Sequence, residues 1–325
     1  MRKNMNTERI TGYIYSFGEA NGKRVLEKKV TGPNSKNPGT EYIAGVINVA
    51  VDEQGLNVIP VAFTYVTPTY SSGKKNNNFD VLAKIIDEGK TWVSDGKDAA
   101  TKVQIDASLG LNDFYIEDAT RGEVLVSSKV NEGSFISIIS VLPEADERNT
   151  FKVDMVITNI THIEADEEKK IDADYVNVRG AVFNFRNELL PVEFVVRNPQ
   201  GMKYFESLEA SSAEPYYTKV WGKINCATIV NQTVEESAFG EAAVRTFEKK
   251  VREWVITGAA KEAYDFGEDE VMTEDELLKA MQDRQVKLAD IKKRNDDWKN
   301  EQSTPAASAP KAATAPKAKN GGFNF

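Results

Sequence analysis

Two ten-residue stretches, NVIPVAFTYV at residues 57–66 and ELLPVEFVVR at residues 188–197, share an apolar-Pro-Val-x-Phe core. Each stretch follows a run of β-branched and apolar residues that contains an internal glycine, Gly45 in the first copy and Gly180 in the second. A glycine inside a long strand is typical of a sharp bend or of a close approach by another backbone. The matching order predicts an internal structural repeat.

The repeat continues downstream of each Pro-Val strand. A short helix is expected at 79–88 and again at 202–210, and a Thr-Lys-Val strand begins at Thr101 and at Thr218. Five strands with one helix between the third and the fourth is the layout of the OB-fold, a small Greek-key barrel. The sequence therefore predicts a mainly β protein with two OB-fold-like five-stranded barrels, each with a short helix. A pair of β-sandwich domains is the competing architecture.

Composition divides the chain into four segments. We expect the first barrel over residues 1–142 and the second over 143–263, with the acidic turn PEADERN at 143–149 between them. An acidic segment and an amphipathic helix follow over 264–301, and the helix starts at the capping box Thr273–Glu276. Residues 302–325 are rich in Ala, Pro and Lys and end in GGFNF, which predicts a disordered tail with an aromatic tip.

The composition excludes several functions. One Cys and one His among 325 residues leave no disulfide framework, no Cys-rich zinc site and no cluster of histidine ligands. We find no Walker loop, no GxGxxG after a strand, no GxSxG, no HExxH and no CxxC. We therefore expect a protein that is not an enzyme and holds neither metal nor cofactor. Without an apolar span or a signal peptide, we expect it in the cytoplasm, of the host if the protein is viral.

Aromatic residues interleave with basic ones on the predicted strands and loops. Aromatic rings stack on the exposed bases of single-stranded nucleic acid, and Lys or Arg neutralises the phosphates. The net charge of −9 argues against a duplex binder that relies on bulk positive charge, yet residues 1–75 carry 10 basic against 6 acidic residues. The candidate nucleic-acid-binding residues are Tyr13, Tyr15, Tyr65, Tyr70, Lys74, Lys75, Trp92, Lys102, Arg179, Phe183, Phe185, Arg186, Arg197, Tyr216, Tyr217, Lys219, Trp221 and Lys223.

The layout resembles that of phage-type replicative single-stranded-DNA-binding proteins. The resemblance rests on the tandem barrel pattern, on the strand PYYTKVWGKI at 215–224 and on a tail that ends in Phe325. It implies a non-enzymatic protein of replication, recombination or repair whose tail recruits partner proteins through Phe323 and Phe325. Tails in that family are acidic next to the tip, whereas this one carries Lys311, Lys317 and Lys319. The resemblance therefore implies that the C-terminal tail docks a partner protein.

A second class of function stays open on the sequence alone. A β-rich chain with a tethered aromatic tip also fits a structural or assembly protein of the virion type, with the tail as an attachment arm. Binding of single-stranded DNA distinguishes the two, because an assembly protein has no need of it. Self-association is compatible with both.

Overall fold

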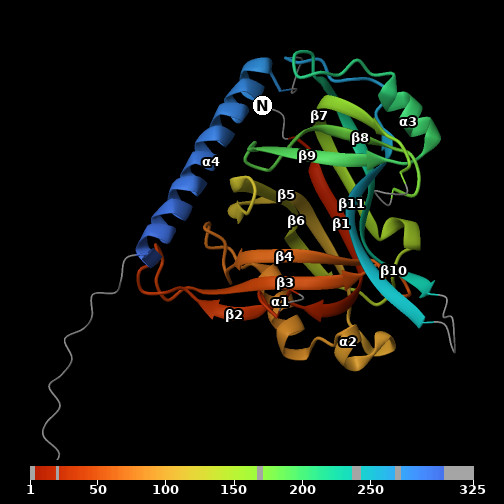
Figure 1. Cartoon of the computed structure of the whole chain (residues 1–325). Helices are drawn as coiled ribbons and strands as arrows, with labels where there is room; N and C mark the ends of the chain where they lie inside the picture. The colour runs from red at the N-terminus through yellow and green to blue at the C-terminus, as the bar shows by residue number, and fades with distance from the viewer. Residues whose placement is uncertain (1–3, 20–21, 167–170, 236–242, 268–271, 304–325) are drawn as a thin grey trace, which may run out of the picture. The chain divides into compact units, whose positions relative to one another are not determined.

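The computed structural model describes residues 4–19, 22–166, 171–235, 243–267 and 272–303 (Figure 1). The chain forms two compact units. One comprises Met1–Asn112 with Ser127–Arg284, and the other comprises Asp113–Val126 with Gln285–Phe325. The first unit holds almost every strand and all of the candidate sites that follow.

The first barrel is a closed ring of five strands. β1 (Asn6–Phe17) pairs antiparallel with β3 (Glu41–Ala50), and β3 pairs antiparallel with β4 (Val58–Val66). β4 pairs in parallel with β6 (Gly122–Ile138), and β6 neighbours β5 (Lys102–Asp118), which returns to β1. Helix α1 (Asn77–Glu88) lies between the third and fourth strands of the ring, as an OB-fold requires.

The second barrel repeats this ring with new strands. β7 (Asn149–Ile163) pairs with β8 (Tyr175–Phe183), and β8 pairs with β9 (Leu189–Val196). β9 contacts β11 (Ala243–Ala259) in parallel, and β10 (Tyr216–Glu235) pairs with both β11 and β7. Helix α3 (Pro199–Glu206) again separates the third and fourth strands. The predicted fold class, mainly β with two OB-like barrels and a C-terminal helix, is confirmed.

The two rings share one continuous sheet. The first half of β1 pairs antiparallel with the first half of β7, from Asn6 opposite Val153 to Ile10 opposite Asn149. The buried apolar side chains of both rings form one core, which includes Ile14 of the first barrel and Phe194 of the second. The predicted boundary at 142/143 lies between β6 and β7. The division of the chain into two domains there stays a prediction.

The two repeated glycines lie where backbones approach closely. Gly45 adopts φ of 145° in β3, and a Cβ at this position would collide with the backbone of Leu26. A Cβ on Gly180 in β8 would collide with the carbonyl oxygen of Val156. Strand register shifts next to both glycines. The sequence-based expectation of a bend at each glycine therefore has a steric cause.

Side-chain caps determine where the helices of the two barrels begin. The Asn76 side chain caps α1 by accepting a hydrogen bond from the Asn78 N–H, and Asn198 caps α3 in the same way ahead of Pro199. α1 lies against β3, and α3 lies against β7 and β8 (Figure 1). Two shorter helices, α2 (Trp92–Asp95) and η1 (Lys97–Ala99), follow α1, and α2 packs against β1.

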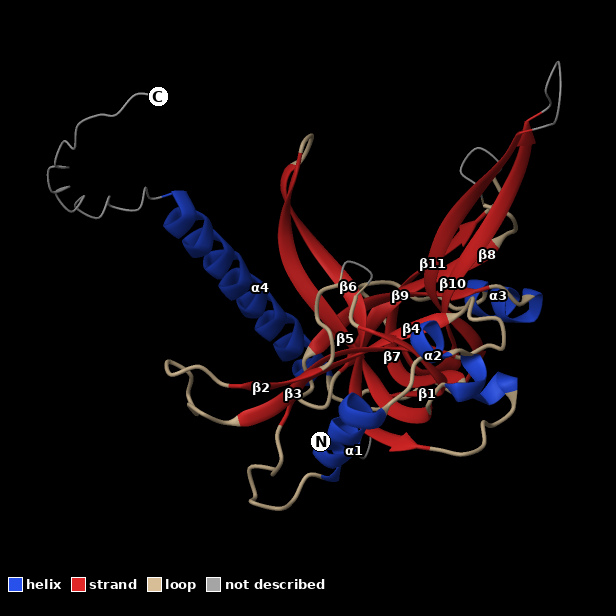
Figure 2. Ribbon diagram, turned by 90° about the horizontal axis from the view of Figure 1, so that it is seen from below, coloured by secondary structure: helices blue, strands red, loops and turns tan. Residues whose placement is uncertain are grey.

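Several predicted element bounds are corrected by the structure. β6 begins at Gly122, well before the end of the predicted first barrel at 142, because it forms a long hairpin with β5. β10 and β11 likewise continue past the barrel as a two-stranded ribbon (Figure 2). β2 (Glu27–Val30) was not predicted and adds an edge strand to β3. Helix α4 (Glu274–Ser303) includes the first two residues of the predicted tail. Residues 304–325 lie outside the described residues.

The smaller unit is held together by ion pairs. Lys299 of α4 contacts Glu117 of β5 at 2.6 Å and Glu123 of β6 at 2.8 Å, and Lys292 lies over the Tyr115 ring at 5.9 Å. These contacts lower the pKa of Glu123 and raise that of Lys299. Polar contacts of this kind fix the helix on the hairpin without a large apolar core.

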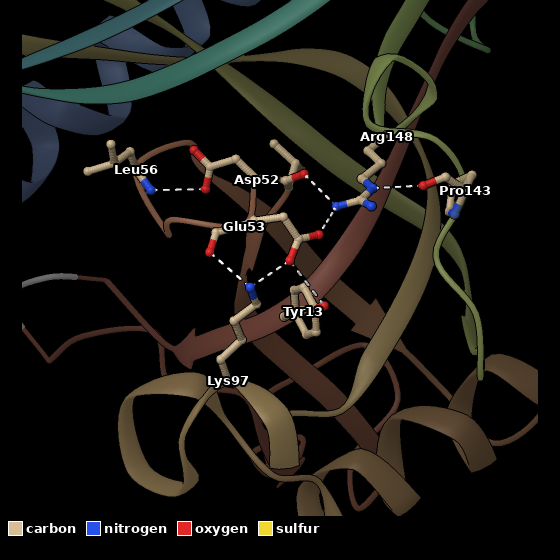
Figure 3. Close-up of polar contacts among 8 residues, drawn as sticks. Tyr13, Asp52, Glu53, Leu56, Lys97, Pro143 and Arg148 are labelled. Atoms are coloured by element: carbon tan, nitrogen blue, oxygen red, sulfur yellow. Dashed lines mark hydrogen bonds and ion pairs between the residues drawn. The ribbon is translucent and has the colours of Figure 1, made fainter.

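A cluster of charged side chains fastens the linker between the barrels to the first barrel (Figure 3). Glu53, in the turn between β3 and β4, accepts hydrogen bonds from Arg148 at 2.7 Å and lies 2.6 Å from the Lys97 ammonium. Arg148 is buried and also donates to the carbonyl oxygen of Pro143 at 2.9 Å. The two cations lower the pKa of Glu53 to about 2.

We expect Glu53→Gln to lower the free energy of unfolding at pH 7 by about 1–2 kcal/mol, because Glu53 is 43% exposed and water screens part of the pairing. The carboxylate stabilises the fold above its ordinary pKa of about 4.5, and this contribution is lost as the pH falls towards 2. Urea unfolding at pH 7 and pH 2.5 measures the difference. If the difference between variant and wild type is as large at pH 2.5 as at pH 7, the ion pairs are not its source.

Candidate nucleic-acid interface

Three of the predicted base-stacking residues, Tyr13, Phe183 and Tyr217, are buried in the core and are therefore weak candidates for stacking on a base. Tyr13 of β1 is one of the predicted nucleic-acid-binding residues. Trp92 of α2 packs edge-on against Tyr13 at 5.6 Å between ring centroids, and the Tyr13 hydroxyl donates to Glu53. A side chain enclosed in this way cannot offer its ring to a base.

Phe183 and Tyr217 are covered by the segment after the second barrel. Tyr264 and Phe266 pack on the Tyr217 ring at 5.0 and 5.5 Å, and the Tyr217 hydroxyl donates to Asn4. Phe183 and Tyr217 belong to a second, smaller apolar cluster, which also contains Met272, just before α4, and Ala280 of α4. This cover comes from residues far along the chain, which strand alternation could not reveal.

Several predicted cations already have carboxylate partners. Arg179 pairs with Glu193, Arg197 with Glu253 at 2.8 Å, and Lys75 with Asp80 at 2.6 Å. Arg197 also lies over the ring of Tyr175. These ion pairs compete with phosphate for the guanidinium and ammonium groups, so these residues are weak candidates for binding.

The remaining predicted residues fall into separate groups. Lys102 lies over the Tyr13 ring, and Tyr15 packs on Trp92 at 6.0 Å. Tyr65 pairs with Tyr42 at 4.8 Å, while Tyr70 and Lys74 are exposed on the loop before α1. The Tyr216 hydroxyl meets that of Tyr204, and Lys219 is half-buried in β10. The structure does not bring these residues together with the set described next.

One cleft of about 1030 Å³ does gather aromatic and basic side chains, and we call it the junction cleft. It lies where β1, β5, β7 and β10 pair side by side, across both barrels. Three exposed aromatic residues line it: Trp221 is 37% exposed, Phe185 66% and Phe135 59%. Arg9, Lys152 and Lys223 line it as well. Arg186, which was also predicted, lies over the Phe185 ring at 5.1 Å.

Strand register fixes the order of these side chains across the sheet. Trp221 of β10 lies opposite Lys152 of β7, which lies opposite Thr7 of β1. In the next outward-facing row, Lys223 lies opposite Thr150, and Thr150 lies opposite Arg9. Neighbouring strands are about 4.8 Å apart, so Lys223 and Arg9 lie two strand spacings from each other, and Lys152 lies on the strand between them.

The Trp221 ring lies against a glycine of the neighbouring strand, which leaves room for it. Gly258 of β11 lies opposite Trp221, and a Cβ built on Gly258 would lie 2.5 Å from the Cε2 atom of the indole. The absence of a side chain at 258 therefore lets the indole lie across the strand.

Sequence reasoning missed Phe135, Arg9 and Lys152, although the signal was present. Ile136 is buried, so Phe135 points outward from β6, and Lys152 stands between the buried Phe151 and Val153. Alternation of this kind identifies outward-facing residues within one strand. It does not show that outward residues of β1, β6, β7 and β10 face one cleft, because strand pairing decides that.

On the inward side of β1 lies a buried polar cluster. Glu8 accepts a hydrogen bond from the Trp254 indole N–H at 2.9 Å, and its second oxygen, Oε2, has no hydrogen-bond partner. Burial raises the pKa of Glu8 to about 8. Lys129 lies 4.7 Å from the Trp254 ring centre, and burial lowers its pKa to about 8. At neutral pH Glu8 is therefore protonated, and it places no negative charge behind the junction cleft.

The family model described as YorF matches residues 16–294 of the chain. The chain belongs to the YorF family. A search of curated proteins finds no match to this YorF chain. The family-model match covers both barrels except for most of β1, and it includes most of α4.

Solved structures similar to this YorF chain include two of the single-stranded DNA binding protein from Thermus aquaticus. The wild-type protein is 9% identical, with a TM-score of 0.45 over 82% of this chain and 97% of that one. A deletion mutant of the same Thermus protein is 10% identical, with a TM-score of 0.42 over 82% and 98%. A Replication Protein A heterotrimer bound to ssDNA is 12% identical, with a TM-score of 0.18 over 81% and 67%.

Two further observations concern metal binding and membrane insertion. In the part of the YorF chain that the structure describes, no three His, Cys, Asp or Glu side chains gather as a metal site would require. None of its described helices is both long enough and apolar enough to cross a membrane.

Proposed function

We propose that this chain binds single-stranded DNA, without catalysis, in the junction cleft. The observation that carries the proposal is that Trp221, Phe185 and Phe135 lie exposed in one cleft with three cations. Each aromatic ring stacked on a base contributes roughly 1–3 kcal/mol and does so with little sequence preference. The cations beside them neutralise phosphates and release counterions.

The local charge favours a polyanion in spite of the net charge of −9. Arg9, Lys152 and Lys223 face the cleft, and Asp106 is the carboxylate paired there, 2.9 Å from the Arg9 guanidinium. A duplex hides its base faces, so exposed aromatic rings gain nothing from it. An unpaired strand offers those faces, which makes single-stranded DNA the better ligand.

The biological setting is part of the same proposal. We place the protein in replication or recombination of a phage or plasmid, where exposed single strands need cover. Phe323 and Phe325, in the residues that the structure does not describe, would recruit replication or recombination proteins. Deleting Gly321–Phe325 should abolish capture of such a partner and leave the affinity for DNA unchanged.

Fluorescence anisotropy of labelled oligo-dT tests the proposal. Arg9 is already paired with Asp106, so the two lysines of the cleft, Lys152 and Lys223, predict a slope of about −1.4 in log K against log salt, or a roughly 7-fold loss of affinity between 50 and 200 mM salt. Lys223→Gln should make the slope shallower by about 0.7. Lys203→Gln, an exposed lysine on α3 outside the cleft, should leave it unchanged.

Absence of binding at 50 mM salt would overturn the proposal and leave the assembly protein as the function. A slope that responds equally to Lys203→Gln and Lys223→Gln would also contradict it, since the phosphates would then not lie in the junction cleft.

A further inference from the structure

A second cleft, of about 690 Å³, lies between β3 and β4 of the first barrel and the ribbon of β10 and β11 from the second. We call it the ribbon cleft. The outward side chains of β4 form its floor, because the alternate residues Ile59, Val61 and Phe63 point into the barrel core. The apolar residues that line the cleft include Val46, Val58, Ala62 and Val251.

The two walls of the ribbon cleft are joined by hydrogen bonds. The N–H of Cys226 in β10 donates to the Asn57 side chain at 2.9 Å, and Asn57 forms a β-bridge with Ala227. The ribbon is thereby fixed on the start of β4. A cleft of this volume with fixed walls is in the range of sites that hold a small ligand or a few side chains.

The polar residues that line the ribbon cleft include two arginines and a buried asparagine. Arg252 is exposed and lies over the Trp254 ring at 5.6 Å. Arg24 has a positive φ of 51°, which is uncommon for a residue with a side chain, and it meets Glu19 at 3.4 Å. Asn131 is 1% exposed and donates to the Pro60 carbonyl oxygen at 2.8 Å, while its own Oδ1 is buried without a hydrogen-bond partner.

We propose that the ribbon cleft binds a short peptide segment of a partner protein, in which an apolar side chain is followed by a carboxylate. The apolar side chain packs on Val58 and Ala62, and the carboxylate pairs with Arg252. The charges of the lining favour an anion, since two arginines stand against Glu19.

The lining favours a peptide over a nucleobase. The walls are aliphatic, and Tyr15 is the aromatic residue among those that line the cleft. Bases bind non-specifically by stacking on flat rings, as the junction cleft can provide, whereas aliphatic walls suit a branched or aromatic side chain. The peptide site is therefore separate from the proposed DNA site, and it does not depend on DNA binding.

Methyl NMR of the full chain, labelled at Val and Leu methyl groups, tests the proposal with a defined probe. We expect acetyl-Ala-Phe-Asp-amide to shift the methyl signals of Val46, Val58 and Val251 saturably. Acetyl-Ala-Phe-Asn-amide should bind about tenfold more weakly, since it forfeits the charge-assisted bond. Arg252→Gln should remove this preference, and Ala62→Leu should block both peptides by filling the floor.

Trp221→Ala is the control for the other cleft and should leave peptide binding unchanged. The proposal is overturned if neither peptide shifts these methyl groups, or if both bind equally to the wild-type chain. It is also overturned if oligo-dT shifts the same methyl groups and displaces the peptide, because the ribbon cleft would then belong to DNA.

Discussion

Replacing Trp221 with Ala should weaken binding of oligo-dT by about 5- to 150-fold, which corresponds to the 1–3 kcal/mol of one stacked base. The ring is 37% exposed, lies in the junction cleft beside Lys152 and is positioned by Gly258. Phe185→Ala should act in the same direction, and the double variant should lose more than either single one. Anisotropy titrations at 50 mM salt measure all three.

Control variants distinguish the loss of base stacking at Trp221 from a nonspecific loss of DNA binding. Trp298→Ala removes an equally large and more exposed ring, from α4, and should leave the affinity unchanged. Trp221→Phe keeps a flat ring and should recover most of the binding. Gly258→Ala keeps the Trp221 side chain but forces its indole off the strand, so it should also weaken binding. Equal losses for Trp221→Ala and Trp298→Ala would contradict the placement of DNA in the cleft.

Replacing Glu8 with Gln should make the protein more stable at pH 8 by roughly 3–5 kcal/mol, given the size of the pKa difference. Burial raises the pKa of Glu8 from about 4.5 to about 8, so the folded state holds a proton that the unfolded chain has released. The wild-type chain therefore loses stability as the pH rises from about 4.5 to about 8. Gln keeps an oxygen for the Trp254 N–H and does not titrate.

Urea unfolding between pH 5 and pH 8 measures the effect. At pH 5 the two proteins should have nearly equal free energies of unfolding. Above pH 5 the variant should become steadily more stable than the wild type. The pH range of the experiment ends at pH 8, because the buried Lys129 loses its proton near that pH. Above pH 8 the folded protein no longer carries this buried charge, so its free energy of unfolding rises. Glu209→Gln, an exposed carboxylate, is the control and should follow the wild-type curve. Parallel curves for Glu8→Gln and the wild type would show that Glu8 is ionised in the fold.

Residues near one another in the sequence predicted the fold well. The Pro-Val strands, the bend glycines Gly45 and Gly180 and the caps of α1 and α3 are all local signals, and each acts in the structure as its chemistry requires. The candidate site was predicted less well. Phe185, Trp221 and Lys223 lie in the junction cleft, but Phe183 and Tyr217 lie in a core made with residues of the C-terminal segment.

The sequence by itself determined two five-stranded barrels, their helices and the set of aromatic and basic residues from which a binding surface could be built. These follow from side-chain periodicity, backbone sterics and capping, which act over a few residues. The tertiary structure alone decided which rings are exposed and which cations stay free of carboxylates. Pairing of β1 with β7 created the junction cleft, and packing of the segment after β11 closed the face around Tyr217. Both are contacts between residues more than forty positions apart, and no pattern within one strand encodes them.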